Sequence, residues 1–138
     1  MRVIVDTNVF MSGMFWSGPP AKILKAWWEK KLNLVLSTDI LDEYIRVGNI
    51  LSKKYHEIGV GIDEVIESLI IRSNLCNVTP LPASVCRDPN DDMFIACALS
   101  ANVKKIISGD ADLLVISGYQ GVHVMKSRDF CDIHLSAP

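Results

Sequence analysis

Short apolar runs alternate along the chain with longer stretches in which apolar residues recur at helical spacing. The first run, Val3-Ile4-Val5, is β-branched, which is typical of a strand buried on both faces of a parallel sheet. Similar runs predict further strands, at residues 32–36, 77–79, 105–107 and 122–124.

Helical periodicity and cap residues predict the elements between these strands. The predicted helices cover 19–31, 38–47, two segments within 50–73, 88–101, 110–115 and 127–133. Residues 10–18 are expected to form a loop, Gly48-Asn49 a break, Gly59-Val60-Gly61 the separator of the two middle helices, and 134–138 a frayed tail. Alternating strands and helices predict right-handed crossovers. The expected fold is therefore a three-layer α/β/α arrangement around a parallel, about five-stranded sheet, in a single domain of residues 1–138.

Composition limits the class of protein. Apolar residues make up 49% and charged residues 22% of the chain, as in ordinary soluble domains. No apolar run approaches the length of a membrane span and no signal peptide precedes the first strand, so we expect a cytoplasmic protein without a membrane partner. The 4 cysteines lack metal-ligand spacing and are expected to be reduced thiols. A net charge of -2 neither excludes nor favours a phosphate-rich substrate.

Several acids occupy similar places in this predicted fold. Asp6 ends the first strand, Asp92 lies in the first turn of the 88–101 helix, and Asp110 and Asp112 follow the fourth strand. The carboxyl ends of parallel strands share one edge, where open α/β sheets bind ligands, so these acids are expected to converge. Structural roles stay open as alternatives, with Asp6 and Asp110 as caps and Asp112 as a first-turn acid.

Glu43 is a further candidate, on the second predicted helix. It falls beside the apolar face formed by Ile40, Tyr44 and Val47. A carboxylate in that position is costly unless a positive group compensates its charge. A salt bridge to a lysine or arginine and a bound metal ion are equally good interpretations of this position.

The start of the 88–101 helix carries three acids. Asp88 is expected to cap the helix and Asp91 to complete a capping box. Asp92 is left without a purely structural role, although periodicity does not separate Asp91 from Asp92 cleanly. We therefore take Asp92 as the candidate ligand.

Like charges that share a cleft need either protons or a cation. Oxygen ligands without clustered histidines or cysteines indicate Mg²⁺ or Mn²⁺ rather than zinc. Such an ion activates water, and a second ion can stabilise the leaving oxygen of an in-line displacement. Phosphodiester hydrolysis is therefore the predicted chemistry.

The acids lie in an ordered set of segments that together resemble the PIN-domain family. The segments are Val3 to Asn8, the helix with Glu43, Arg87 to Ala96, and Ser108 to Leu114. They cover essentially the whole chain. The motifs Arg-Asp-Pro-x-Asp-Asp and Gly-Asp-x-Asp-Leu-Leu are similar to those of prokaryotic members described as toxins of toxin–antitoxin pairs, the VapC-like ribonucleases.

The resemblance implies a Mg²⁺- or Mn²⁺-dependent endoribonuclease that cuts single-stranded or exposed RNA. It also implies a homodimer and a small antitoxin protein as a partner. Carried over by motif position, the catalytic and metal-binding residues would be Asp6, Glu43, Asp92 and Asp110, with Asp112 as an accessory ligand. The supporting residues would be Thr7 or Asn8, through hydrogen bonds, and Ser108 at the edge of the site.

Two other functions fit part of the pattern. A PIN-fold module that binds nucleic acid or protein without turnover would use the acids for structure alone, and it would take up no Mn²⁺. A phosphotransfer protein of the haloacid-dehalogenase type needs a second aspartate two residues after the first, where this chain has Asn8. Response-regulator receivers need paired acids after the first strand, which the chain also lacks, so phosphotransfer is disfavoured.

Overall fold

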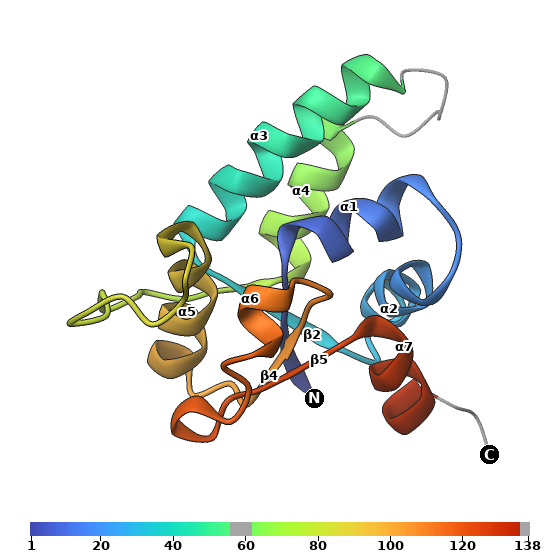
Figure 1. Ribbon diagram of the computed structural model, residues 1–138. Helices are drawn as coiled ribbons and strands as arrows, with labels where there is room; N and C mark the ends of the chain where they lie inside the picture. The colour runs from blue at the N-terminus through green and yellow to red at the C-terminus, as the bar shows by residue number, and fades with distance from the viewer. Residues whose placement is uncertain (56–61, 136–138) are drawn as a thin grey trace.

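The chain forms a five-stranded parallel sheet in the order β3-β2-β1-β4-β5, with helices on both sides, in a computed structural model that describes residues 1–55 and 62–135 (Figure 1). Helices α2 and α7 lie on one side of the sheet and α5 on the other (Figure 1). The predicted three-layer α/β/α fold is therefore confirmed. The strands are β1 (Arg2–Val5), β2 (Asn33–Leu36), β3 (Asn74–Leu75), β4 (Lys105–Ile107) and β5 (His123–Met125).

Seven α-helices and three helical turns of 3₁₀ or π type connect and follow the strands of the described residues. The α-helices are α1 (Thr7–Phe15), α2 (Pro19–Trp28), α3 (Thr38–Lys54), α4 (Ile62–Arg72), α5 (Asp92–Ala101), α6 (Ala111–Leu114) and α7 (Ser127–Phe130). The 3₁₀ turns are η1 (Pro89–Asp91) and η2 (Tyr119–Gly121), and η3 (Cys131–Leu135) is a π-helical turn.

Strand β1 occupies the centre of the sheet because its side chains are apolar on both faces. Val3, Ile4 and Val5 are at most 1% exposed. All five strands run parallel, and β1 rises from the N-terminus at the bottom of Figure 1 towards α1. Their carboxyl ends, and the residues that follow them, therefore share the upper edge of the sheet.

The expected loop at residues 10–18 is wrong, because α1 already begins at Thr7. Asp6 caps this helix by accepting a hydrogen bond from the Val9 N–H at 2.8 Å, and Phe10 is buried. Gly13 sits inside the helix where a Cβ atom would lie 2.7 Å from Leu24. The glycine thus permits α1 and α2 to pack closely instead of ending the helix.

Several predicted boundaries also need correction. Helix α3 continues through the buried Gly48, so the break expected there is absent, and β3 ends before the predicted 77–79 strand begins. The predicted 88–101 helix starts with the 3₁₀ turn η1 before α5. The separator Gly59-Val60-Gly61 lies outside the described residues, as do residues 136–138 of the predicted tail.

Tyr44 links α3 to the end of the central strand β1. Its ring stacks on Phe10 of α1 with 4.5 Å between centroids, and its hydroxyl donates a hydrogen bond to the Val5 carbonyl. Burial, followed by the charge of Asp6, raises the pKa of this hydroxyl well above its ordinary value. Tyr44 therefore remains a neutral donor and fixes the start of α3 beside Asp6.

Candidate active site

Asp6 and Ser108 lie next to each other because the backbone ladder continues past the strand ends. The Asp6 N–H donates to the Ile107 carbonyl at 3.0 Å, and the Ser108 N–H donates to the Met125 carbonyl at 2.9 Å. Both side chains are buried, and the Ser108 hydroxyl donates a hydrogen bond to Asp6 Oδ2. With the Val9 N–H on Oδ1, this bond holds the carboxylate in one orientation.

The electrostatic state of Asp6 reflects its burial. Removal from water raises its pKa above the ordinary 3.8, and the nearby charge of Asp110 raises it further. The hydrogen bonds from Ser108 and Val9 act in the opposite direction but do not cancel the effect. A positive charge at this place would stabilise the ionised form.

A second group of acids meets at the same edge. One carboxylate oxygen from each of Asp91, Asp110 and Asp112 lies within 4.8 Å of the other two. Asp91 ends η1, whereas Asp110 caps α6 by accepting a hydrogen bond from the Asp112 N–H at 2.9 Å. The three partly buried side chains, named here the acidic cluster, thus come from two segments far apart in the sequence.

Asp91 carries the largest penalty in this cluster. Burial, together with the charges of Asp110 and Asp88, raises the pKa of Asp91 to about 7. Its Oδ2 atom is buried and has no hydrogen-bond partner among the described residues. An unpartnered carboxylate oxygen among like charges matches the ligand set that a hard divalent cation prefers, so the residues present fit such an ion.

Asp92 has a structural role in the described residues. Its carboxylate accepts hydrogen bonds from Ser84 Oγ at 2.5 Å and from the backbone N–H groups of Val85 and Cys86, at 3.1 and 2.8 Å. Burial acts to raise the pKa of Asp92, but these bonds outweigh it and hold the pKa below 3.8. Asp92 therefore anchors the preceding loop to α5, and its assignment as a metal ligand stays a prediction.

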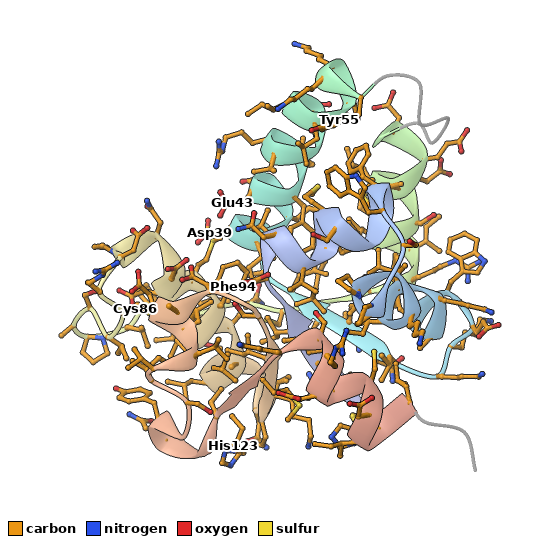
Figure 2. All side chains as sticks on the ribbon, turned by 45° about the vertical axis from the view of Figure 1, so that its right-hand side comes forward. Asp39, Glu43, Tyr55, Cys86, Phe94 and His123 are labelled. Atoms are coloured by element: carbon orange, nitrogen blue, oxygen red, sulfur yellow. The ribbon has the colours of Figure 1, made fainter. Side chains whose placement is uncertain are left out.

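Glu43 is paired with an arginine of its own helix. Arg46 Nη2 lies 2.5 Å from Glu43 Oε1, which corresponds to the salt-bridge interpretation of this position. Figure 2 shows Glu43 and Asp39 on the same side of α3, towards the segment that carries Cys86. Glu43 keeps 24% of its side chain exposed, so its carboxylate remains open to a ligand from solvent.

Asp112 is also partly neutralised. Arg87 contacts it with two nitrogens, at 3.1 Å from Nε to Oδ1 and 3.3 Å from Nη2 to Oδ2. The Arg87 side chain is 86% exposed, and solvent weakens the pair. Arg87 thus lies at the rim of the acidic cluster, where it could exchange Asp112 for another anion.

A shallow pocket lies beside Asp6 and one member of the acidic cluster, Asp110. It has a volume of about 540 Å³ and is bordered by Asp6, Asn8, Gly109 and Asp110. The Thr7 hydroxyl is buried and has no hydrogen-bond partner within the described part of the chain, so the support expected from Thr7 stays a prediction. Asp110 borders the pocket and belongs to the acidic cluster, which makes it the link between Asp6 and Asp91.

A family model described as PIN domain matches residues 2–112. The chain belongs to the PIN-domain family. A sequence search of curated proteins finds no significant match. PIN domains are generally nucleases that use divalent metal ions, so family membership supports phosphodiester hydrolysis with a nucleic acid as the substrate.

The matched region of this PIN domain contains every acid named above. It begins in β1 and ends at Asp112 of α6, so it includes both segments of the acidic cluster and the helix with Glu43. Within the described residues, no helix is both long and apolar enough to cross a bilayer.

The sequence indicated where the site lies but did not identify Asp91. It placed Asp6, Asp110 and Asp112 at the carboxyl edge of the sheet, and the structure has them there. The sequence signal that could have indicated Asp91 is Asp88-Pro89. Proline in a first turn is compatible with a 3₁₀ turn, and such a turn changes the direction of the next side chains relative to an α-helix.

Proposed function

We propose that this PIN domain is a Mg²⁺- or Mn²⁺-dependent endoribonuclease that hydrolyses single-stranded or exposed RNA. The convergence of Asp91, Asp110 and Asp112 beside the oriented carboxylate of Asp6 is the observation that carries the proposal. The RNA preference rests on the resemblance of the Arg-Asp-Pro-x-Asp-Asp and Gly-Asp-x-Asp-Leu-Leu motifs to ribonuclease members of the family.

The residues that would hold a divalent cation are the acidic cluster and Asp6. We assign Asp91 to this set in preference to Asp92, whose carboxylate is already occupied by three donors. When bound, the cation supplies charge neutralisation at the phosphate and a lower pKa for an attacking water. Glu43 would become a further ligand when Arg46 leaves their ion pair and binds a substrate phosphate, because arginine forms strong hydrogen bonds with phosphate.

The chain's own residues prepare the reaction by orientation. Ser108 and the Val9 N–H fix the two oxygens of Asp6, so no reorganisation is needed when substrate arrives. Exposed Arg87 can bind a phosphate of the RNA at the rim of the cluster. Binding there would free Asp112 as a ligand, so substrate and metal would favour each other.

The biological role that we propose is the toxin of a toxin–antitoxin pair, acting as a homodimer and inhibited by a small antitoxin protein. The motif resemblance supports this role. Exposed apolar side chains on α2 and α4 are candidate contacts for either partner, namely Trp28, Ile70 and Ile71. Growth arrest on expression of the wild type, absent with an inactive variant, would support the toxin assignment.

The decisive experiment measures cleavage of a labelled single-stranded RNA with Mn²⁺. We expect Asp6→Asn to abolish cleavage while circular dichroism and Tm show an intact fold, because the buried carboxylate is lost from the site. Asp42→Asn makes the same chemical change at an exposed position of α3 and should cleave like the wild type. Equal Mn²⁺-dependent cleavage by Asp6→Asn and wild type would refute the proposal.

A second candidate function is a nucleic-acid- or protein-binding module without turnover. The ion pairs of Glu43 with Arg46 and of Asp112 with Arg87 favour this function, because they neutralise two of the acids without a metal ion. Isothermal titration calorimetry separates the two functions. Uptake of Mn²⁺ that Asp91→Asn removes supports the nuclease, whereas no uptake by the wild type supports the binding module.

A further inference from the structure

Two thiols, one directly after β3 and one within α5, lie in contact. Cys76 Sγ and Cys97 Sγ are 3.3 Å apart, although 21 positions separate the residues in the sequence. Cys76 directly follows β3, and its N–H donates to the Leu36 carbonyl at 3.0 Å, so the sheet holds its backbone. Cys97 is completely buried in the middle of α5. Both sulfurs are therefore carried by ordered elements.

Cys76 is the thiol that a small molecule can reach. It borders a pocket of about 550 Å³ together with Asn77, Val78 and Met93, and Cys97 lies behind it. A disulfide has a sulfur–sulfur distance of about 2.05 Å, so closure requires an approach of about 1.2 Å from the observed 3.3 Å. The loop that follows Cys76 has no regular secondary structure before η1 and can supply this shift.

We propose that Cys76 and Cys97 are a modification site, at which a hydroperoxide that enters this pocket converts the two thiols into a reversible intramolecular disulfide. The Cys76 thiolate attacks the terminal peroxide oxygen, the O–O bond breaks, and Cys76 becomes a sulfenic acid, while the other oxygen leaves as an anion that takes a proton from solvent and is released as an alcohol, or as water when the oxidant is hydrogen peroxide. Cys97 sulfur then attacks Cys76 sulfur and displaces the sulfenic hydroxyl group, which takes up the Cys97 proton and leaves as water. Overall, the two thiols lose two protons and two electrons, and the peroxide is reduced.

The order of the steps follows from burial. Removal from water, with the neighbouring Cys76 thiol, raises the pKa of Cys97 well above its ordinary value, so Cys97 remains protonated at neutral pH. Cys76 is therefore the residue that reacts first, and Cys97 resolves it.

The disulfide would restrain a segment that matters for the site. The closed loop of residues 76–97 includes Asp91 of the acidic cluster and Asp92 with its anchored loop. Cross-linking this segment reduces the freedom of the unfolded chain. The inference does not depend on nuclease activity, because it concerns the thiol pair alone.

Peptide mapping of the full-length protein tests the inference directly. The purified, reduced protein is treated with hydrogen peroxide, alkylated and digested without reductant. We expect a cross-linked pair of peptides containing Cys76 and Cys97, lighter by about 2 Da than the sum of the reduced peptides and lost after treatment with dithiothreitol. Oxidation should also raise the Tm by about 5–10 °C.

Matched variants separate the pair from general thiol oxidation. Cys76→Ser should eliminate both the cross-link and the Tm rise, whereas Cys131→Ser, the same change at a buried thiol outside the pair, should retain both. Peroxide that leaves Cys76 as a sulfinic acid, links it to a second chain, or gives no Cys76–Cys97 peptide pair in the wild type would overturn the inference. The wild-type map decides the question even where a variant fails to fold.

Discussion

Replacing Asp91 by asparagine should stabilise the metal-free protein and remove its response to Mn²⁺. Asp91 lies among the carboxylates of Asp110 and Asp112, and its pKa is raised to about 7 from the ordinary 3.8. At about 1.4 kcal/mol for each pH unit, full ionisation would cost about 4 kcal/mol. Because solvent reaches this partly buried side chain and screens its charge, we expect about 1–2 kcal/mol in practice.

The assay is thermal unfolding at pH 8, in EDTA and then in Mn²⁺. In EDTA, Asp91→Asn should raise the Tm by about 3–8 °C, because the neutral amide no longer repels its neighbours. Added Mn²⁺ should raise the Tm of the wild type through binding to the folded state, and it should leave the variant nearly unchanged.

Asp92→Asn is the matched control for this experiment. It makes the same chemical change one residue later, where the carboxylate accepts bonds from Ser84 and two backbone N–H groups. Weakening these charge-assisted bonds should cost about 1–2 kcal/mol in EDTA, and the Mn²⁺ response should survive. The reasoning is refuted if Asp91→Asn is destabilised in EDTA, or if Asp92→Asn is the variant that loses the Mn²⁺ response.

Three further predictions concern the remainder of the fold and its pH dependence. In the folded state Asp91 keeps its proton up to about pH 7, whereas the unfolded chain releases it near pH 4. In EDTA, the Tm of the wild type should therefore contain a component that decreases as the pH rises from about 4 to about 7, and Asp91→Asn should lack this component. Tyr44→Phe should lower the free energy of unfolding in urea by about 1–2 kcal/mol, because it leaves a buried carbonyl of β1 without its donor, and an unchanged value would contradict that role. Gly13→Ala should cost about 1–3 kcal/mol by forcing its Cβ against Leu24, while Gly109→Ala, where a Cβ meets nothing within 4 Å, should cost much less.

The centre of the sheet was predictable because β1, β2 and β4 contain short, continuous apolar runs, whereas the two-residue β3 (Asn74–Leu75) has no such run and was misplaced at 77–79. Val3-Ile4-Val5 is apolar at every position, which indicates burial on both faces and therefore a central place. The rule that ligands bind at the carboxyl ends of strands then placed Asp6 and Asp110 near each other. Neither step required a side-chain distance.

The helix starts were harder to predict, for two physical reasons. Gly13 resembles a helix breaker in the sequence, but it is required by the close approach of Leu24, a contact that only the folded chain contains. Residues Pro89–Asp91 form a 3₁₀ turn, which has three residues per turn. A face assignment that assumes the 3.6 residues per turn of an α-helix from Asp88 onwards therefore places the following side chains on the wrong face. This is why Asp91 and Asp92 could not be separated.

The backbone ladder that runs through Asp6 and Ser108 has a consequence for how the domain can lose activity. The Asp6 amide is bonded to β4, which neighbours the central strand, whereas the Ser108 amide is bonded to the edge strand β5, so Asp6 shares the rigidity of the protected centre of the sheet. Fraying of peripheral segments would change which molecules gain access, yet it would leave the Asp6 carboxylate in place. Inactivation by heat or denaturant should accordingly coincide with global melting instead of preceding it.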